Sequence, residues 1–115
     1  MKLLQRIKLF TRSIKHAYQK LTRGFSDADL WYLDYTIAKF VLPRLKAFRE
    51  MNGAYPGTEP MGTDEKWDAA LDEMIWAMQF VVDVSKCDAE INSENYDRCQ
   101  KGLELFSRWF CSLWY

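Results

Sequence analysis

The sequence has few of the residues on which catalytic and metal sites depend. It contains a single histidine, His16, with no cysteine or acid in helical register. Metal ligation and histidine acid–base catalysis both need such partners, so we interpret His16 as a solvated surface residue. Gly-rich phosphate loops and serine-nucleophile motifs are absent as well. We therefore expect a protein that is not an enzyme and that uses no cofactor and no metal.

Cysteines and long apolar runs are also scarce. The three cysteines, Cys87, Cys99 and Cys111, are odd in number and form no C-x-x-C pair, which argues against a disulfide scaffold and favours a reducing cytosol. The first ten residues are too interrupted by charge for a signal peptide. No apolar run approaches the roughly 20 residues that span a bilayer. We expect a cytoplasmic protein without a transmembrane segment.

Glycine and proline gather in one stretch, residues 52–63, which holds three of the five glycines and two of the three prolines. This stretch is the one clear loop, and strand-like alternation is absent elsewhere. The expected fold is an all-α, three- to four-helix bundle in a single domain, 1–115. Its expected parts are a basic amphipathic helix over 1–24, a kinked helix over 26–51, the loop, and helices over 64–84 and 93–114.

Apolar residues recur at helical spacing in three of these segments. In the first they form a heptad seam of the kind that packs two helices together, at Leu3, Ile7, Phe10, Ile14, Ala17 and Leu21. The third segment repeats the spacing at Trp67, Leu71, Met74, Met78 and Val81, flanked by Ile75 and Val82. The fourth does so at Tyr96, Cys99, Leu103, Phe106, Phe110 and Leu113. Ser26, Thr63 and either Asn92 or Ser93 are the expected N-caps.

The second segment carries two anomalies. Pro43 removes a backbone donor near its centre, so we expect a kink just before it. Asp34 shares a helical face with Leu30 and Ile37, and an unpaired buried carboxylate is costly. We expect Asp34 either to pair with Arg44, across the kink or an oligomer interface, or to contact a ligand or partner.

The charge of the chain is unevenly distributed although its sum is zero. Residues 1–25 contain no acid and seven bases, Lys2, Arg6, Lys8, Arg12, Lys15, Lys20 and Arg23. Lys8, Arg12 and Lys15 are the candidate contacts for an anionic partner. Nucleic-acid phosphates, an anionic membrane surface and an acidic protein all fit this pattern, as does a bundle helix with a charged outer face. The acids of the third segment are interpreted as a solvated face or as a docking surface for the basic helix.

Aromatic residues are abundant: five tryptophans, six tyrosines and seven phenylalanines. So much large apolar surface exceeds what a small core hides, so we expect a homo-oligomer and a partner-binding surface. The candidate binding residues are Trp31, Asp34, Arg44 and Trp114. A tryptophan that stacks on a base and an arginine that holds phosphate would suit nucleotide capture.

Three stretches, GFSDADLWYLDYTIAKFVLPRLKAF, KWDAALDEMIWAMQF and QKGLELFSRWFCSLW, together resemble a family of small tailed-phage proteins of unknown function. The resemblance covers about residues 24–114 and leaves the basic helix outside. It implies action in an infected bacterial cytoplasm and carries no established activity. We expect a non-enzymatic accessory protein that binds a host component, in counter-defence, by sequestering a signalling nucleotide or blocking a host protein. A nucleic-acid-binding protein that uses the basic helix and a structural assembly protein are the alternatives.

Overall fold

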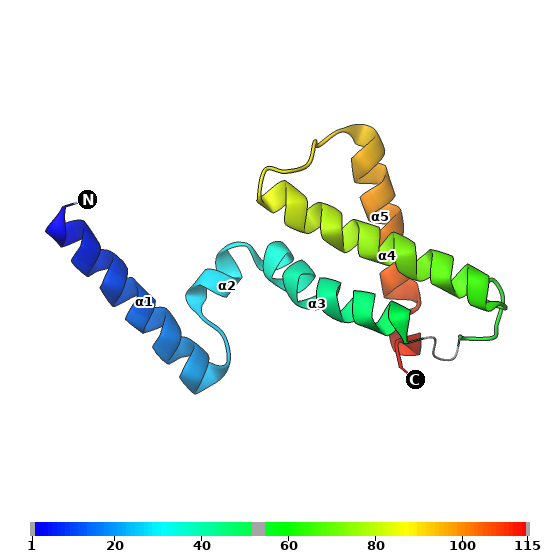
Figure 1. The fold of residues 1–115 in the computed structure, drawn as a ribbon, viewed down its shortest axis with the longest axis horizontal. Helices are drawn as coiled ribbons and strands as arrows, with labels where there is room; N and C mark the ends of the chain where they lie inside the picture. Colours follow the sequence, from blue (N-terminus) through cyan, green and yellow to red (C-terminus); the bar gives the residue numbers. More distant parts are fainter. Residues whose placement is uncertain (1, 52–54, 115) are drawn as a thin grey trace. The chain divides into compact units, whose positions relative to one another are not determined.

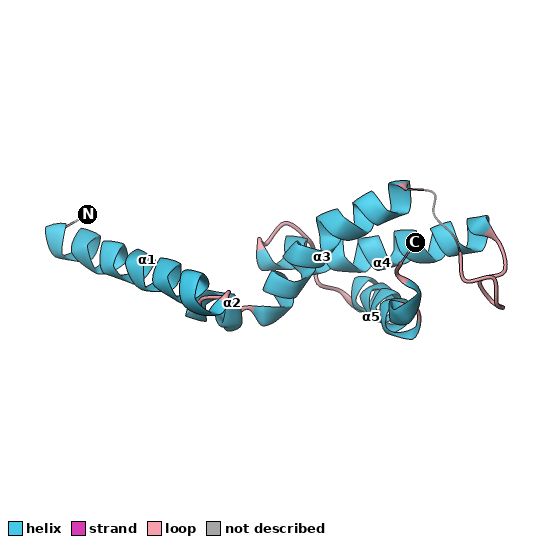
Figure 2. Cartoon of the chain, turned by 90° about the horizontal axis from the view of Figure 1, so that it is seen from below, coloured by secondary structure: helices cyan, strands magenta, loops and turns pink. Residues whose placement is uncertain are grey.

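The structure is a computed structural model that describes residues 2–51 and 55–114. Within these ranges every regular element is helical, so the all-α prediction is confirmed (Figures 1 and 2). The chain divides into two compact units, one ending at Thr36 and one beginning at Ile37. The elements in order are α1 (Leu3–Arg23), α2 (Asp27–Trp31), α3 (Leu33–Glu50), α4 (Asp64–Ser85), α5 (Ser93–Arg108) and a 3-10 helix, η1 (Phe110–Ser112).

The first unit consists of α1, α2 and the start of α3. Gly24 adopts a left-handed conformation (φ 86°) that L side chains rarely take, and its N–H caps α1 by donating to the Lys20 carbonyl at 3.0 Å. Gln19 then holds the start of α2: its amide nitrogen donates to Asp27 Oδ2 at 2.9 Å, and its amide oxygen accepts from the Asp27 N–H at 2.8 Å. These bonds fix α2 against one side of α1.

The prediction of a single helix over 26–51 is wrong. Tyr32 (φ −130°, ψ 66°) interrupts it, so α2 ends at Trp31 and α3 begins at Leu33. The Thr36 hydroxyl donates to the Asp29 carbonyl at 2.9 Å, which satisfies an acceptor near the interruption. Ser26 is the N-cap of α2 as predicted, and its N–H donates to the Asp29 carboxylate at 2.9 Å. Pro43 lies inside α3, and the kink expected there stays a prediction.

The core of the second unit lies around α4. The stripe predicted for the third segment is buried at five of its seven positions, Trp67, Leu71, Met74, Met78 and Val82. Residues of α3 and α5 complete this core, among them Ala38, Leu42, Leu45 and Cys99. Thr63 and Asn92 are the N-caps of α4 and α5, as predicted, and each side chain accepts a backbone N–H, at 3.3 and 2.8 Å.

Helices α4 and α5 approach closely at Gly102. A Cβ there would lie 2.6 Å from the Ala77 Cβ and 2.6 Å from the Glu73 carbonyl oxygen, so the contact requires glycine. The predicted helix over 93–114 is shorter than expected: α5 ends at Arg108 and η1 follows. Its predicted seam is only partly buried, since Tyr96 and Phe110 remain exposed.

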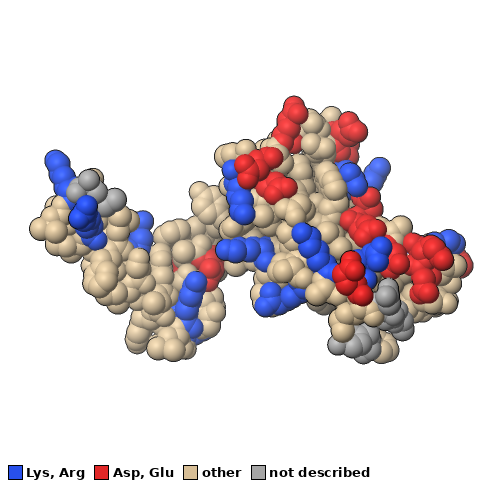
Figure 3. Space-filling model, in the orientation of Figure 1, with Lys and Arg blue, Asp and Glu red and all other residues tan. Residues whose placement is uncertain are grey.

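Acidic residues of α4 connect it to both neighbouring helices. Arg49 of α3 bonds Asp72 at 3.0 Å and lies 3.6 Å from Asp68. Arg98 of α5 forms two bonds to Glu73, at 3.1 and 3.0 Å. Figure 3 shows acidic side chains gathered over α4 and the start of α5. Part of the acidic face predicted for α4 therefore pairs with bases of its own unit.

Candidate functional site

The apolar side of α1 is open to solvent. No residue of α1 is buried, and the predicted seam positions that are large, Leu3, Ile7, Phe10, Ile14 and Leu21, are 52–86% exposed. Leu4 and Tyr18 extend the same face. We call this face the apolar stripe: Leu3, Leu4, Ile7, Phe10, Ile14, Ala17, Tyr18 and Leu21. The seam was predicted to pack against another helix, and within the first unit it does not.

Helix α2 contacts the other side of α1. The Trp31 ring meets His16 edge-on, with 5.4 Å between ring centroids, and the Arg12 guanidinium lies 5.8 Å from the Trp31 centroid. Two predicted binding residues, Trp31 and Arg12, thus share one cluster. The interpretation of His16 as a solvated residue is wrong in part, because the ring is half-buried in this contact. The sequence analysis did not predict this contact, because it forms only when the chain turns at Gly24.

Asp27 is the electrostatic centre of the first unit. Hydrogen bonds from Gln19 and Arg23 lower its pKa from 3.8 to about 2, and Lys15, 3.6 Å away, acts in the same direction. The Ser26 N–H lowers the pKa of Asp29. Both carboxylates are therefore ionised at neutral pH. Lys15, which was predicted to contact an anionic partner, already lies beside the Asp27 carboxylate of its own unit.

Lys8, another predicted contact, lines a shallow hollow on α1 with Gln5, Leu9 and Arg12. Because all four residues come from one helix, this hollow is part of an exposed helix face. It offers two cations and no enclosing wall. Its chemistry suits an extended anionic surface better than a small ligand.

Asp34 is exposed, which corrects the expectation of a buried carboxylate. The interruption at Tyr32 places Asp34 in the first turn of α3, where free N–H groups favour an acid. Its Oδ1 accepts from the Tyr35 N–H at 2.8 Å. The sequence analysis predicted one helix over residues 26–51, which placed Asp34 in the interior of a helix and not in its first turn.

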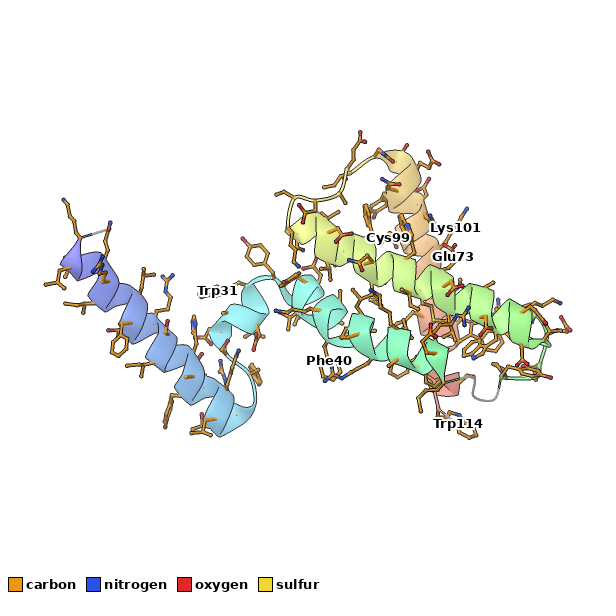
Figure 4. All side chains as sticks on the ribbon, viewed as in Figure 1. Trp31, Phe40, Glu73, Cys99, Lys101 and Trp114 are labelled. Carbon is orange, nitrogen blue, oxygen red and sulfur yellow. The ribbon has the colours of Figure 1, made fainter. Side chains whose placement is uncertain are left out.

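Arg44 has a different partner from the one predicted. Its guanidinium lies 3.7 Å from the centroid of the Phe40 ring, and its Nη1 donates to the Phe40 carbonyl at 2.9 Å. Phe40 is itself 59% exposed and projects from α3 on the side away from α4 (Figure 4). The pair forms a flat, cationic–aromatic edge.

This edge borders an apolar groove of about 240 Å³ in the second unit. Phe106 and Phe110 both line it and meet edge-on, with ring centroids 5.5 Å apart. We call it the aromatic groove; it is lined by Phe40, Val41, Arg44, Leu45, Phe48, Phe106, Phe110 and Leu113. Sequence reasoning singled out only Arg44 from this set. Phe106, Phe110 and Leu113 were assigned to the apolar seam of the fourth segment, and α5 ends before Phe110, which is exposed.

Trp114 lies elsewhere in the second unit and is 70% exposed (Figure 4). It lines a separate hollow with Tyr55, Pro56, Thr58 and Ser112. The structure therefore does not place Trp114 in the aromatic groove with Arg44. Of the two candidate tryptophans, Trp31 is the one for which the structure gives an arginine contact, with Arg12 5.8 Å from its centroid.

The described residues contain no group of three histidine, cysteine or acidic side chains that could hold a metal ion. Burial raises the pKa of the Cys99 thiol, which keeps it neutral, and Cys87 and Cys111 are free and exposed. None of the helices in the described part of the chain is long and apolar enough to cross a membrane. The exposed surfaces described above offer aromatic, aliphatic and cationic side chains for contact with a partner.

Comparison of the chain with protein-family models, curated proteins and solved structures finds no match. The resemblance to tailed-phage proteins therefore stays a prediction, and the functional argument depends on the exposed surfaces described above.

Proposed function

We propose that the chain is a non-catalytic accessory protein of a tailed phage that binds a host protein in the infected bacterial cytoplasm. The proposed role is counter-defence, by blocking that host protein. The observation that carries the proposal is the aromatic groove, which is lined by seven apolar side chains and one arginine and in which the Phe40 and Phe110 rings are exposed. Exposed aromatic rings next to an arginine are the composition of protein–protein hot spots.

The chemistry of the groove supports a protein partner over a signalling nucleotide. Among the residues that the structure describes, Arg44 is the only charged side chain that lines it, and its Nη1 already donates to the Phe40 carbonyl. Several phosphates would need several donors, whereas an apolar helix with one acid needs apolar walls and one cation. The groove supplies those, so the proposed occupant is an amphipathic helix of the host protein that places an acidic residue on Arg44.

The proposal includes two structural predictions made from the sequence, a kink at Pro43 and a homo-oligomer. Pro43 removes an N–H from the middle of α3, and a kink there would turn the helix beside the groove. The chain also exposes Ile37, Phe40, Phe110 and Trp114 in a unit of fewer than 80 residues, which supports a homo-oligomer.

Native mass spectrometry of the protein purified gently from infected cells tests the proposal, because one spectrum reports subunit number, protein partners and retained small molecules. The spectrum of Phe110→Ser is compared with that of Tyr96→Ser. Both changes remove an exposed ring, 58% and 55% exposed, but only Phe110 lines the groove. A thermal melt of each variant establishes that it is folded.

The expected result is a stoichiometric host protein that is retained by the wild type and Tyr96→Ser and lost from Phe110→Ser. Rebinding of the purified partner completes the test. A stoichiometric nucleotide-sized mass lost on Arg44→Ala would instead support nucleotide capture. Large homo-oligomers that hold no partner and that dissociate on Phe110→Ser would assign the groove to self-assembly and contradict the proposal.

A further inference from the structure

We propose that α1 is an interfacial helix that lies along an anionic lipid surface, with its apolar stripe among the acyl chains and the bases that border the stripe, Arg6, Lys8 and Lys15, at the phosphate headgroups. This inference concerns the first unit alone and does not depend on the aromatic groove. It is argued from the stripe, from the contacts of α2 and from the placement of charge.

The stripe has the width of a membrane-interface helix. At 100° per residue its eight members cover an arc of about 140°, and α1 extends for about 31 Å. Lys8 and Lys15 border one edge of this arc and Arg6 borders the other. Apolar residues on one face with bases at both margins are typical of helices that lie in the headgroup plane.

The fold of the first unit leaves this face open. Helix α2 contacts α1 through Gln19, Arg23 and His16 of α1. Gln19 and Arg23 donate to the Asp27 carboxylate at 2.9 and 2.6 Å, and His16 meets the Trp31 ring. All three side chains lie on the far side of α1 from the stripe. The unit therefore uses the polar side of α1 for its own contacts, and the stripe has no intramolecular partner there.

Charge selects among the possible occupants of the stripe. If α1 paired with a second copy, Arg6 and Lys20 would flank the seam, and residues 1–25 contain no acid to pair with them. Nucleic acid would neutralise the bases but leave the stripe in water. An anionic bilayer surface covers the stripe and pairs with the bases that border it, so of these three occupants it is the one that satisfies both halves of the helix.

The test is co-sedimentation of the full chain with lipid vesicles. One set is phosphatidylcholine alone, and the other contains about one third phosphatidylglycerol. Ile14→Ser removes a side chain from the stripe. Leu9→Ser is the matched control, because Leu9 is 48% exposed and lies across the helix beside Lys8 and Arg12. Circular dichroism confirms that both variants keep their helices.

The wild type and Leu9→Ser are expected to bind the anionic vesicles, and Ile14→Ser to bind about tenfold more weakly. Binding should fall about 100-fold or more on neutral vesicles, because several bases lose their counter-charge. Equal binding of Ile14→Ser and Leu9→Ser would overturn the proposal. So would a dimer in sedimentation velocity that Ile14→Ser dissociates, or nucleic-acid binding with no affinity for vesicles.

Discussion

The contact between α4 and α5 at Gly102 makes the sharpest prediction for the second unit. In Gly102→Ala the new Cβ would lie 2.6 Å from the Ala77 Cβ and from the Glu73 carbonyl oxygen. Neither neighbour can rotate away, since one is bonded directly to the backbone and the other belongs to it. The two helices must therefore separate or shift, which disturbs the packing of Cys99 and the rest of the core.

The size of the effect follows from two opposing contributions. Alanine favours an α-helix over glycine by about 1 kcal/mol. Overpacking costs about 1–3 kcal/mol, and with two rigid neighbours we expect the upper end of that range. The free energy of unfolding should then fall by about 2 kcal/mol. For a unit of this size, that lowers the Tm by roughly 10 °C.

Thermal melts followed by circular dichroism measure this change. The double variant Ala77→Gly/Gly102→Ala removes one of the two clashes, so its loss should be smaller than the sum of the single losses by about 1 kcal/mol. A Gly102→Ala protein that melts at or above the wild-type temperature would refute the close approach of the two helices.

Three further predictions concern single contacts. The first concerns Asp27, whose pKa is lowered from 3.8 to about 2 in the folded unit, so that its stabilisation of the unit is complete above pH 3.8 and is lost as the pH falls towards 2. The NMR signals of the His16 ring should shift over that pH window. The substitution Asp27→Asn should abolish this transition. Arg98→Ala removes two bonds to Glu73 and a guanidinium 4.2 Å from the Trp76 centroid, and since these groups are partly exposed the loss should be about 1 kcal/mol in urea denaturation; an unchanged midpoint would contradict it. Thr63→Ala should cost about 1 kcal/mol in the same assay by removing the N-cap of α4, with Thr63→Ser as the control that keeps the cap.

The sequence predicted best where a pattern is local and repeated. The period of Trp67, Leu71 and Met74 identified the buried side of α4, and the hydroxyl and amide before each acidic turn identified its cap and that of α5. These signals depend on neighbours a few residues apart. In these helices the tertiary packing buries the side that the local pattern indicates.

The prediction failed where an interruption carries no composition signal. Tyr32 is an ordinary helical residue, yet it ends α2, while Pro43, the strongest breaker in the segment, lies inside α3. The expectation that Asp34 is buried, and so needs a partner such as Arg44, depended on that uninterrupted helix. The aromatic groove was missed for a related reason, because a regular heptad cannot reveal that its last turns tighten into η1 and expose Phe110.

Site-specific photo-crosslinking tests the central claim, that this protein works by binding a partner in the aromatic groove. A photoreactive phenylalanine analogue is placed at Phe110 in one protein and at Tyr96 in the other, and both are irradiated in infected cells. We predict a crosslinked host protein from position 110 and none from position 96. Equal crosslinking at both positions, or none at 110 from a folded protein, would contradict the account.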